Sequence, residues 1–260
     1  MTTIREIIAT LEKFAPLPLQ EDYDNSGLQV GLTETDDVSG VLLCLDPTEA
    51  TIDEAVSKGC NMIVSHHPLI FRPIRKVESG DMVSRVLVKA IRNNVAIYSA
   101  HTNLDNSIPG VSSHMAERLG LTNVKALGSD SAGRCSGVIG EFESPLSEND
   151  FLNLVKDRFE VSCIRHNALL GRNIQKVALC GGSGAFLSHD ACVAGADAFV
   201  TGEIGYHRFF GFDGVMKLVE TGHYESEQYT VELLEKVLRS AFPELGIVRT
   251  SVRVNPVNYM

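Results

Sequence analysis

Two adjacent histidines, His66 and His67, follow the apolar run CNMIV at residues 60–64. Imidazole is the side chain that most often binds metal ions in proteins. In a continuing strand the two rings would point to opposite faces, but a bend beyond the strand, where Pro68 restricts the backbone, would turn both toward one site. The alternative is a pair of polar residues that water satisfies at the end of a strand. The pair therefore needs further ligands nearby before it indicates a metal site.

A second polar segment, HTNLD at residues 101–105, follows the next apolar run, VAIYSA at 95–100. If the two runs form neighbouring parallel strands, this segment lies beside the His66–His67 pair. A carboxylate such as Asp105 next to imidazoles supplies negative charge and can bridge two divalent cations. Taken alone, Asp105 and Asn106 are better explained as a turn.

A third segment, GHYESE at residues 222–227, follows the run MKLVE. His223 and Glu227 are four residues apart and would share one face of a helix. The alternative, that the glutamates only stabilise the positive N-terminus of the helix, does not account for His223. A single tetrahedral zinc needs three or four ligands, whereas five side chains better suit two ions about 3.5–4 Å apart. The three segments together predict a dinuclear centre whose ligands are His66, His67, Asp105, His223 and Glu227.

Two further features could assist such a centre. Glu203 and His207 are also four residues apart after an expected strand, and they could bind metal themselves, orient ligands or transfer protons; the alternative is an exposed surface pair. We assign catalytic proton transfer to His101, Glu203 and His207. The glycine-rich run GGSG at 181–184 could cradle an anion with its N–H groups or simply form a tight turn, and no Walker motif occurs.

Strands and helices that alternate along the chain must position these side chains. Strands are expected at residues 40–45, 60–64 and 95–100, with helices after Pro47 and over 82–91. Further strands are expected at 136–142, 161–164, 177–180, 198–201, 216–220 and 247–254, with helices over 149–159 and 227–238. This order predicts an α/β fold with largely parallel sheets. Ligands gather beyond the carboxyl ends of such strands, where the polar segments fall.

The chain length suits one large domain or two small ones, and the polar run at 127–135 is the best candidate for a boundary between two α/β regions. We expect residues 1–126 with 228–260 to form the first domain and 127–227 the second.

Composition excludes several classes of protein. The net charge is −10 and no cluster of Lys and Arg stands out, which disfavours nucleic-acid binding. No apolar run reaches the roughly 18 residues of a membrane span. Thr3 and Glu6 have the spacing of a capping box, so the first residues predict an amphipathic helix rather than a signal peptide. Six scattered cysteines without a CxxC pair indicate a reducing compartment, and we expect a cytoplasmic protein.

Six ordered motifs resemble the NIF-three-like family, whose members are often called GTP cyclohydrolase I type 2 homologs. They are DNSGLQVG at 24–31, SHHP at 65–68, HTNLD at 101–105, GGSG at 181–184, TGEIGYH at 201–207 and GHYESE at 222–227. The resemblance implies two interlinked α/β domains with a dinuclear site in the cleft between them, the same five ligands, and His101 close to the metals. It also implies a toroidal homohexamer built as a trimer of dimers.

Two hypotheses for function follow. In the first, the protein is a metal-dependent hydrolase in which two divalent ions activate a bridging water, with a small molecule or nucleotide as substrate, as the cyclohydrolase label says. In the second, it is a non-catalytic metal-binding scaffold, a regulator or a metal-trafficking ring. Mixed imidazole and carboxylate ligands admit zinc, manganese, iron, cobalt or nickel.

Overall fold

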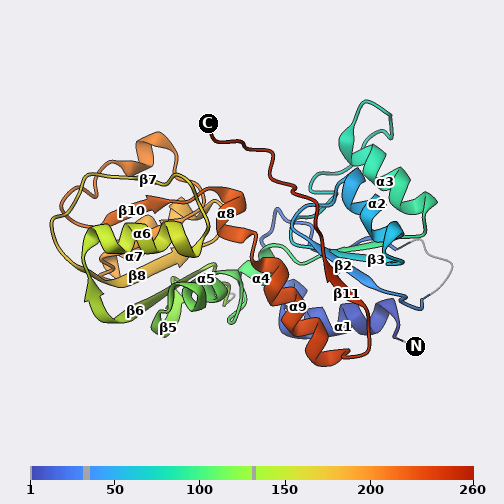
Figure 1. Cartoon of the computed structure of the whole chain (residues 1–260), viewed down its shortest axis with the longest axis horizontal. Coiled ribbons are helices and arrows are strands. Elements are labelled where there is room, and N and C mark those ends of the chain that lie inside the picture. The colour runs from blue at the N-terminus through green and yellow to red at the C-terminus, as the bar shows by residue number, and fades with distance from the viewer. Residues whose placement is uncertain (1, 32–35, 131–132) are drawn as a thin grey trace. The chain divides into compact units, whose positions relative to one another are not determined.

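The computed structural model describes residues 2–31, 36–130 and 133–260. The chain divides into two compact units: unit 1 comprises Met1–Leu104 and Thr230–Pro256, and unit 2 comprises Asp105–Tyr229 and Val257–Met260. Each unit has its own β-sheet with helices packed against it (Figure 1). The predicted α/β fold is therefore confirmed.

Unit 1 contains a five-stranded sheet with the order β1-β4-β3-β2-β11. Its strands are β1 (Gly27–Val30), β2 (Val41–Cys44), β3 (Met62–Ser65), β4 (Ala96–Ser99) and β11 (Ile247–Arg249). The last four are parallel, and β1 runs antiparallel to β4 at one edge. Strands β2, β3 and β4 are buried at every position, as expected of strands covered on both faces.

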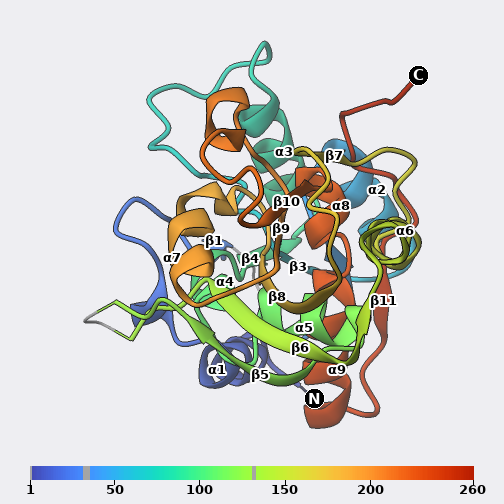
Figure 2. The same ribbon diagram turned by 90° about the vertical axis from the view of Figure 1, so that its left-hand side faces the viewer.

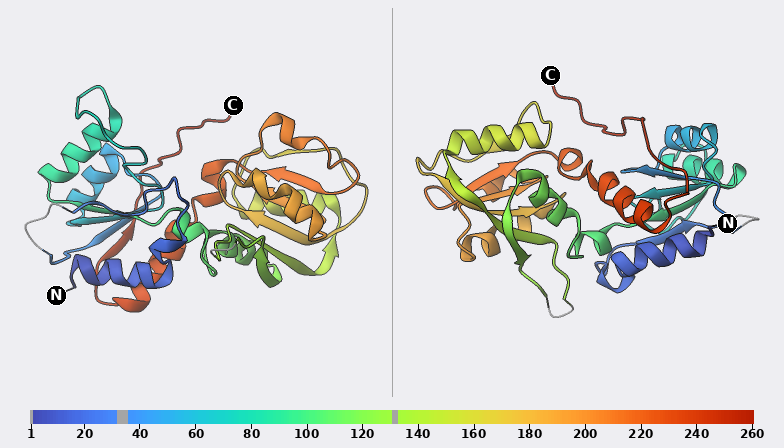
Figure 3. Two further views of the ribbon diagram at one scale, coloured as in Figure 1. Left: turned by 180° about the vertical axis from the view of Figure 1, so that it is seen from behind. Right: turned by 60° about the horizontal axis from the view of Figure 1, so that its bottom comes forward.

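Helices cover both faces of this sheet (Figure 3). They are α1 (Ile4–Phe14), α2 (Glu49–Ser57), α3 (Met82–Arg92) and α9 (Thr230–Ala241), with a short 3-10 helix η1 (Leu17–Leu19) and one turn, α4 (Thr102–Asp105). Helices α2 and α3 pack against the strands and each other, while α9 packs against β2, β11 and α1. The capping box predicted at Thr3 and Glu6 is present: the Thr3 N–H donates to Glu6, and the Thr3 hydroxyl accepts from the Glu6 N–H.

The register of β3 and β4 determines where the polar segments emerge. Ser65 pairs with Ser99 at the last position of both strands, and their hydroxyl oxygens are 2.8 Å apart. The residues that follow each strand therefore leave the sheet at the same edge. This places His66 and His67 beside His101, as the sequence predicts.

Unit 2 contains a six-stranded mixed sheet with the order β5-β6-β8-β9-β10-β7. Its strands are β5 (Thr122–Leu127), β6 (Gly137–Leu146), β7 (Arg165–His166), β8 (Ile174–Cys180), β9 (Ala198–Thr201) and β10 (Lys217–Glu220). Strands β8, β9 and β10 are parallel, while β5, β6 and β7 pair antiparallel with their neighbours. The parallel strands form the centre of the sheet, and the antiparallel ones extend it on either side.

The helices of unit 2 are divided between the two faces of its sheet, with α6 on one side and α7 on the other (Figure 2). They are α5 (Val111–Leu119), α6 (Glu148–Arg158), α7 (Ser188–Val193) and α8 (His223–Glu227), with 3-10 helices η2 (Gly184–Leu187) and η3 (Tyr206–Phe209). Unit 2 has two hydrophobic cores. One contains Met115, Phe151 and Val177, and the other contains Leu187, Phe199 and Leu218. Successive residues of each strand thus point to opposite faces of the sheet and pack into different cores.

The boundary between the units differs from the predicted one. Residues 105–126 belong to unit 2, because α5 packs against β6 and β8, and β5 pairs with β6. The chain returns to unit 1 at Thr230, close to the predicted 228, but residues 257–260 group with unit 2. Residues 131–132 of the predicted boundary run lie outside the described residues.

Several predicted elements also change. Residues 161–164 are not a strand, because the Val161 N–H donates to the Lys156 carbonyl and closes the end of α6 instead of joining a ladder. The helix predicted over 227–238 is two helices, α8 and α9, and the last strand ends at Arg249. Strands β1 and β5 and helix α5 were not predicted. In the described part of the chain, no helix combines the length and apolar character that a membrane span requires.

Candidate metal centre

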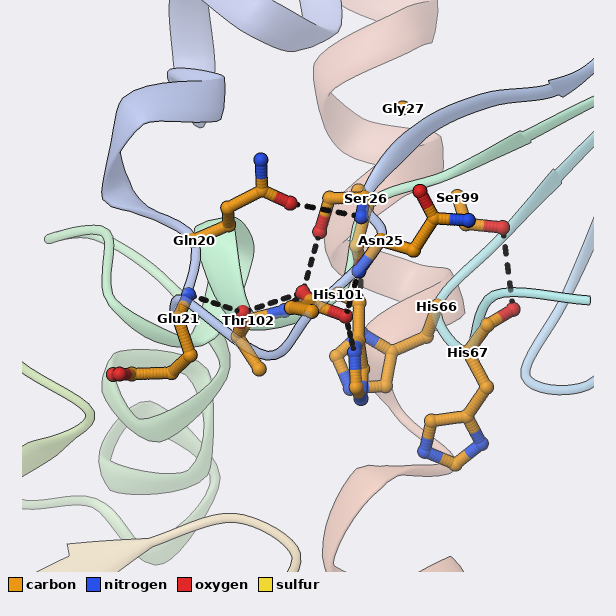
Figure 4. A network of polar contacts seen from close by, with 12 residues as sticks. Gln20, Glu21, Asn25, Ser26, Gly27, His66, His67, Ser99, His101 and Thr102 are labelled. Carbon is orange, nitrogen blue, oxygen red and sulfur yellow. Dashed lines mark hydrogen bonds and ion pairs between the residues drawn. The ribbon is translucent and has the colours of Figure 1, made fainter. Parts of the chain in front are cut away.

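Three histidine rings meet at the edge of the unit 1 sheet. The ring centroids of His66 and His67 are 4.9 Å apart, and that of His101 lies 5.4 Å from the first and 5.5 Å from the second. One ligand nitrogen of each ring lies within 4.8 Å of the others. Figure 4 shows the three rings below the segment that carries Asn25 and Ser26. His66 is fully buried, and the other two are partly exposed.

The δ nitrogen of each ring is held by an oxygen acceptor. His66 Nδ1 is 2.8 Å from the carbonyl oxygen of Ala100, which can only accept a hydrogen bond. His67 Nδ1 is 2.8 Å from Asp46 Oδ1. Because these acceptors favour a proton on Nδ1, the lone pair of each neutral ring lies on Nε2, the nitrogen that a metal would take.

His101 follows the same pattern through Asp24. Its Nδ1 is 2.7 Å from Asp24 Oδ1, and the Thr102 N–H donates to Oδ2 at 3.0 Å. The side chain of Asp24 is fully buried. Burial by itself raises the pKa of this carboxyl, but hydrogen bonds from His101, Thr102 and Ser26 outweigh it and hold the pKa well below its ordinary value. Asp24 is therefore a carboxylate that orients His101.

Sequence reasoning did not identify Asp24 or Asp46 as site residues. Asp24 heads the DNSGLQVG motif, so the motif carried a signal, although the motif gives no indication of the partner 77 residues away. Neighbouring contacts fix the same segment: the Ser26 N–H donates to Gln20, and the Glu21 N–H donates to Thr102 (Figure 4). Asp46 lies two residues beyond the end of β2, where residues that follow a parallel strand are expected to contribute to a site.

In unit 2, His223 and Glu227 lie at the two ends of α8. His223 Nε2 is 3.1 Å from Glu227 Oε2, and its Nδ1 is 3.2 Å from Glu203 Oε1. The Glu227 side chain is only 4% exposed. As predicted, the pair shares one helix face. Glu203 orients the ring as Asp24 and Asp46 do in unit 1.

The glycine-rich loop lies directly against this pair. A Cβ added at Gly182 would lie 2.3 Å from Glu227 Oε1 and 3.4 Å from His223 Cε1. The Gly182 N–H donates to the Ser226 hydroxyl at 3.0 Å, and its carbonyl accepts from the Glu203 N–H at 3.0 Å. The Ser183 hydroxyl donates to the Glu203 carboxylate. The loop therefore holds the carboxylates of Glu203 and Glu227 in position. This role of GGSG differs from the anion cradle and the tight turn that the sequence suggests.

Asp105, the last residue of α4, lies near a buried thiol of unit 2. Burial first, and then the nearby carboxylates of Asp105 and Glu227, raise the pKa of the Cys180 thiol well above its ordinary value. The thiol stays protonated and so is a poor metal ligand. Asp105 and Glu227 are neighbours within unit 2, since one carboxylate oxygen of each lies within 4.8 Å of the other.

His207 lies apart from these groups. Residues 203–205 are not helical, so Glu203 and His207 do not share a helix face. His207 is exposed on η3, where its ring lies 5.1 Å from Tyr206 and 6.4 Å from Phe210. It belongs to an aromatic cluster rather than to the carboxylate–histidine pair.

A comparison with protein families shows which family the chain belongs to. The family model described as Duf34/NIF3 (NGG1p interacting factor 3) matches residues 2–256. The chain belongs to the Duf34/NIF3 family.

Duf34/NIF3 relatives match over nearly the whole chain. A protein of Clostridium acetobutylicum called GTP cyclohydrolase 1 type 2 homolog is 31% identical, covering 94% of this chain and 92% of the relative. One of the same name from Clostridium perfringens is 32% identical over 99% of both. Among solved structures, Staphylococcus aureus hypothetical protein SA1388 is 25% identical with a TM-score of 0.90, covering 100% of this chain and 99% of the other. Reduced HcgD of Methanocaldococcus jannaschii is 27% identical with a TM-score of 0.78, covering 96% and 98%.

Proposed function

We propose that this Duf34/NIF3 protein is a hydrolase that depends on two divalent metal ions. The observation that supports this most directly is the shared arrangement of its histidines. His66 and His67 each have Nδ1 against an oxygen acceptor, so Nε2 is the nitrogen that a metal would take. Nδ1 of His223 likewise lies against Glu203, and its Nε2 faces Glu227, the other proposed ligand of α8. Such orientation is typical of histidines that ligate metals, and the residues therefore fit the group that the resemblance implies.

The proposed ligands are those predicted from sequence: His66, His67, Asp105, His223 and Glu227. We propose that the histidines of unit 1 and the carboxylates of unit 2 serve one centre. Helix α4 supports this, because it is a single turn that starts directly after His101 and ends at Asp105. When bound, the ions would lower the pKa of a water and hold a substrate oxygen.

The residues around the ligands would perform the rest of the chemistry. In this proposal His101 accepts a proton at Nε2, and the buried carboxylate of Asp24 stabilises the imidazolium that forms. Glu203 holds Nδ1 of His223 and so turns Nε2 toward Glu227, the other proposed ligand of α8. The structure suggests no comparable role for His207. The names of the relatives make hydrolytic opening of a nucleotide ring the first reaction to test.

Metal content per chain tests the centre. We expect about two ions in protein purified without a chelator or a histidine tag, and far fewer in an Asp105→Ala, Glu227→Ala double variant. The control is an Asp190→Ala, Asp213→Ala variant, which removes the same charge from two exposed positions of unit 2. Equal metal content in all three proteins would contradict the ligand assignment.

Activity is a separate measurement. Metal-loaded wild-type protein and His66→Ala should be compared with GTP and with simple phosphoesters and amides. Metal-dependent turnover in the wild type alone supports a hydrolase. Two bound ions without turnover on any of these substrates would favour the metal-binding scaffold or trafficking protein.

The assembly is also a proposal that rests on the family resemblance. We propose a toroidal homohexamer, and sedimentation of the metal-loaded protein tests it. A mass of six chains supports the assembly, and a stable monomer at micromolar concentration contradicts it.

A further inference from the structure

Unit 2 carries a pocket that the metal chemistry does not use. It has a volume of about 410 Å³ and is lined by Ile164, Arg165, His166, Tyr206, Phe209 and Phe210. Volumes of about 300–1,000 Å³ are typical of sites for small molecules and cofactors. The lining combines apolar and aromatic walls with a guanidinium group and an imidazole. This is the composition of a ligand site rather than of a packing defect.

Two of its aromatic rings are unusually exposed. Tyr206 is 68% exposed and Phe210 is 61% exposed, and their ring centroids lie 5.6 Å apart at an interplanar angle of 77°. His207 stacks on Phe210 from outside the pocket, with 27° between the ring planes. Large aromatic side chains gathered at the surface mark binding surfaces, because their apolar faces gain by being covered.

The charged group of the pocket has a defined position. The Arg165 guanidinium lies 5.3 Å from the centroid of the Phe209 ring, and its Nη1 is 2.7 Å from Glu220 Oε1. A guanidinium has five N–H donors, so this ion pair fixes the group without using all of them. The remaining guanidinium N–H donors, beside the exposed rings, suit a ligand that joins a flat ring to a group of hydrogen-bond acceptors such as a phosphate.

The pocket and the His223–Glu227 pair are joined through one short segment. The second oxygen of Glu220 accepts from the Ile204 N–H at 2.9 Å, which holds the segment between β9 and η3. Glu203, the neighbour of Ile204, orients His223, and Tyr206 begins η3 two residues later. A ligand in the pocket would thus contact the same loop that positions a proposed metal ligand.

We propose that this pocket binds a planar heteroaromatic phosphate ester of the nucleotide class. Its ring stacks on Tyr206 and Phe210, and its phosphate pairs with Arg165. As a substrate subsite the pocket rests on the proposed function, but binding there requires no metal ion. Its test therefore uses metal-free protein, so that failure of the pocket and failure of the hydrolase can be told apart.

The experiment is calorimetric titration of the full chain, dialysed against a chelator, with GMP, guanosine and inorganic phosphate. We expect saturable binding of one GMP per chain, weaker binding of guanosine and weakest binding of phosphate. Phe210→Ala should weaken GMP binding about tenfold, as expected when one base–aromatic stack is lost. Arg165→Gln should weaken GMP binding but leave guanosine binding nearly unchanged.

The matched control is Phe186→Ala, because Phe186 is also 61% exposed in unit 2 but does not line the pocket. It should bind GMP like the wild type, and thermal unfolding verifies that each variant is folded. Absence of saturable GMP binding, or equal binding by Phe210→Ala and wild type, would overturn the proposal. So would a Tyr206→Ala, Phe210→Ala variant that changes the oligomeric mass with GMP affinity intact, since the rings would then form an interface between copies.

Discussion

A single methyl group added at Gly182 should displace Glu227, one of the proposed metal ligands. The added Cβ of Gly182→Ala would lie 2.3 Å from Glu227 Oε1 and 3.2 Å from Glu227 Cδ. Ordinary contacts begin near 3.4 Å, so the carboxylate oxygen must move by roughly 1 Å. Because Glu227 is almost entirely buried, it has little space in which to do so.

The size of this displacement determines the expected effect. Metal–ligand distances tolerate only about 0.2 Å, so a shift of roughly 1 Å takes the oxygen out of bonding range. We expect metal affinity to fall at least by the 10–100-fold typical of losing an orienting partner. Gly182 also has φ +56°, where an L-residue costs about 1 kcal/mol in stability. The variant should therefore be slightly less stable and should bind metal much more weakly.

Two other glycines separate these effects. Gly214 has φ +70° with open space around its position, so Gly214→Ala carries the backbone strain without the collision. Gly205 has φ −62° and open space, so Gly205→Ala should carry neither. Calorimetric titration with Mn²⁺ or Zn²⁺ and thermal unfolding of all four proteins give the comparison. The reasoning is refuted if Gly182→Ala binds metal as tightly as Gly214→Ala.

Three further outcomes are expected. Asp24→Asn should lower the turnover of the metal-loaded protein by about 100-fold with its metal content unchanged, because an amide can present an N–H to His101 and change which ring nitrogen carries the proton; unchanged turnover would count against the orienting role. Glu148→Gln should lower the free energy of unfolding in urea by about 3–5 kcal/mol, because the fully buried Lys217 loses the carboxylate that lies 2.7 Å away. The double variant with Lys217→Met should recover part of that loss. A loss below about 1 kcal/mol in Glu148→Gln would refute the reasoning. Glu54 is hydrogen-bonded by a lysine and by two hydroxyl groups of the C-terminal segment, and these bonds outweigh burial and lower its pKa from 4.5 to about 2. Its stabilisation is present above pH 4.5 and is lost as the pH falls toward 2, so the stability gap between wild type and Glu54→Gln should narrow over that window; a constant gap would contradict it.

The local pattern of apolar runs in the sequence was enough to predict that the three histidines of unit 1 lie close together. The apolar runs before His66 and His101 are short, continuous and separated by a helix, which is the signature of adjacent parallel strands. The observed pairing of Ser65 with Ser99 follows from that arrangement and places both segments at one edge. The i, i+4 spacing of His223 and Glu227 worked for the same reason, since it depends only on one turn of helix.

Contacts between distant segments could not be predicted in this way. Asp24 reaches His101 from the irregular segment that precedes β1, a four-residue antiparallel strand whose burial does not alternate. Glu203 and His207 have the same spacing as His223 and Glu227, but the backbone after β9 is not helical, so the spacing alone does not place them on one helix face. The role of Gly182 depends on a close approach to Glu227 that a GGSG run cannot reveal. Such features are set by tertiary packing, which overrides local preference.

The division of unit 1 between the two ends of the chain has a consequence for synthesis on the ribosome. Helix α1 packs against α9, and β2 pairs with β11, yet α9 and β11 are made last. At about 5–20 residues per second, the roughly 220 residues between α1 and α9 take on the order of 10–45 s to translate. During that time the apolar face of α1 lacks its native cover, whereas the body of unit 2 is contiguous from residue 105 to 229 and can fold first. A nascent chain that stalls before residue 230 would therefore expose the N-terminal helix to chaperones and proteases, although all five proposed ligands had already been made.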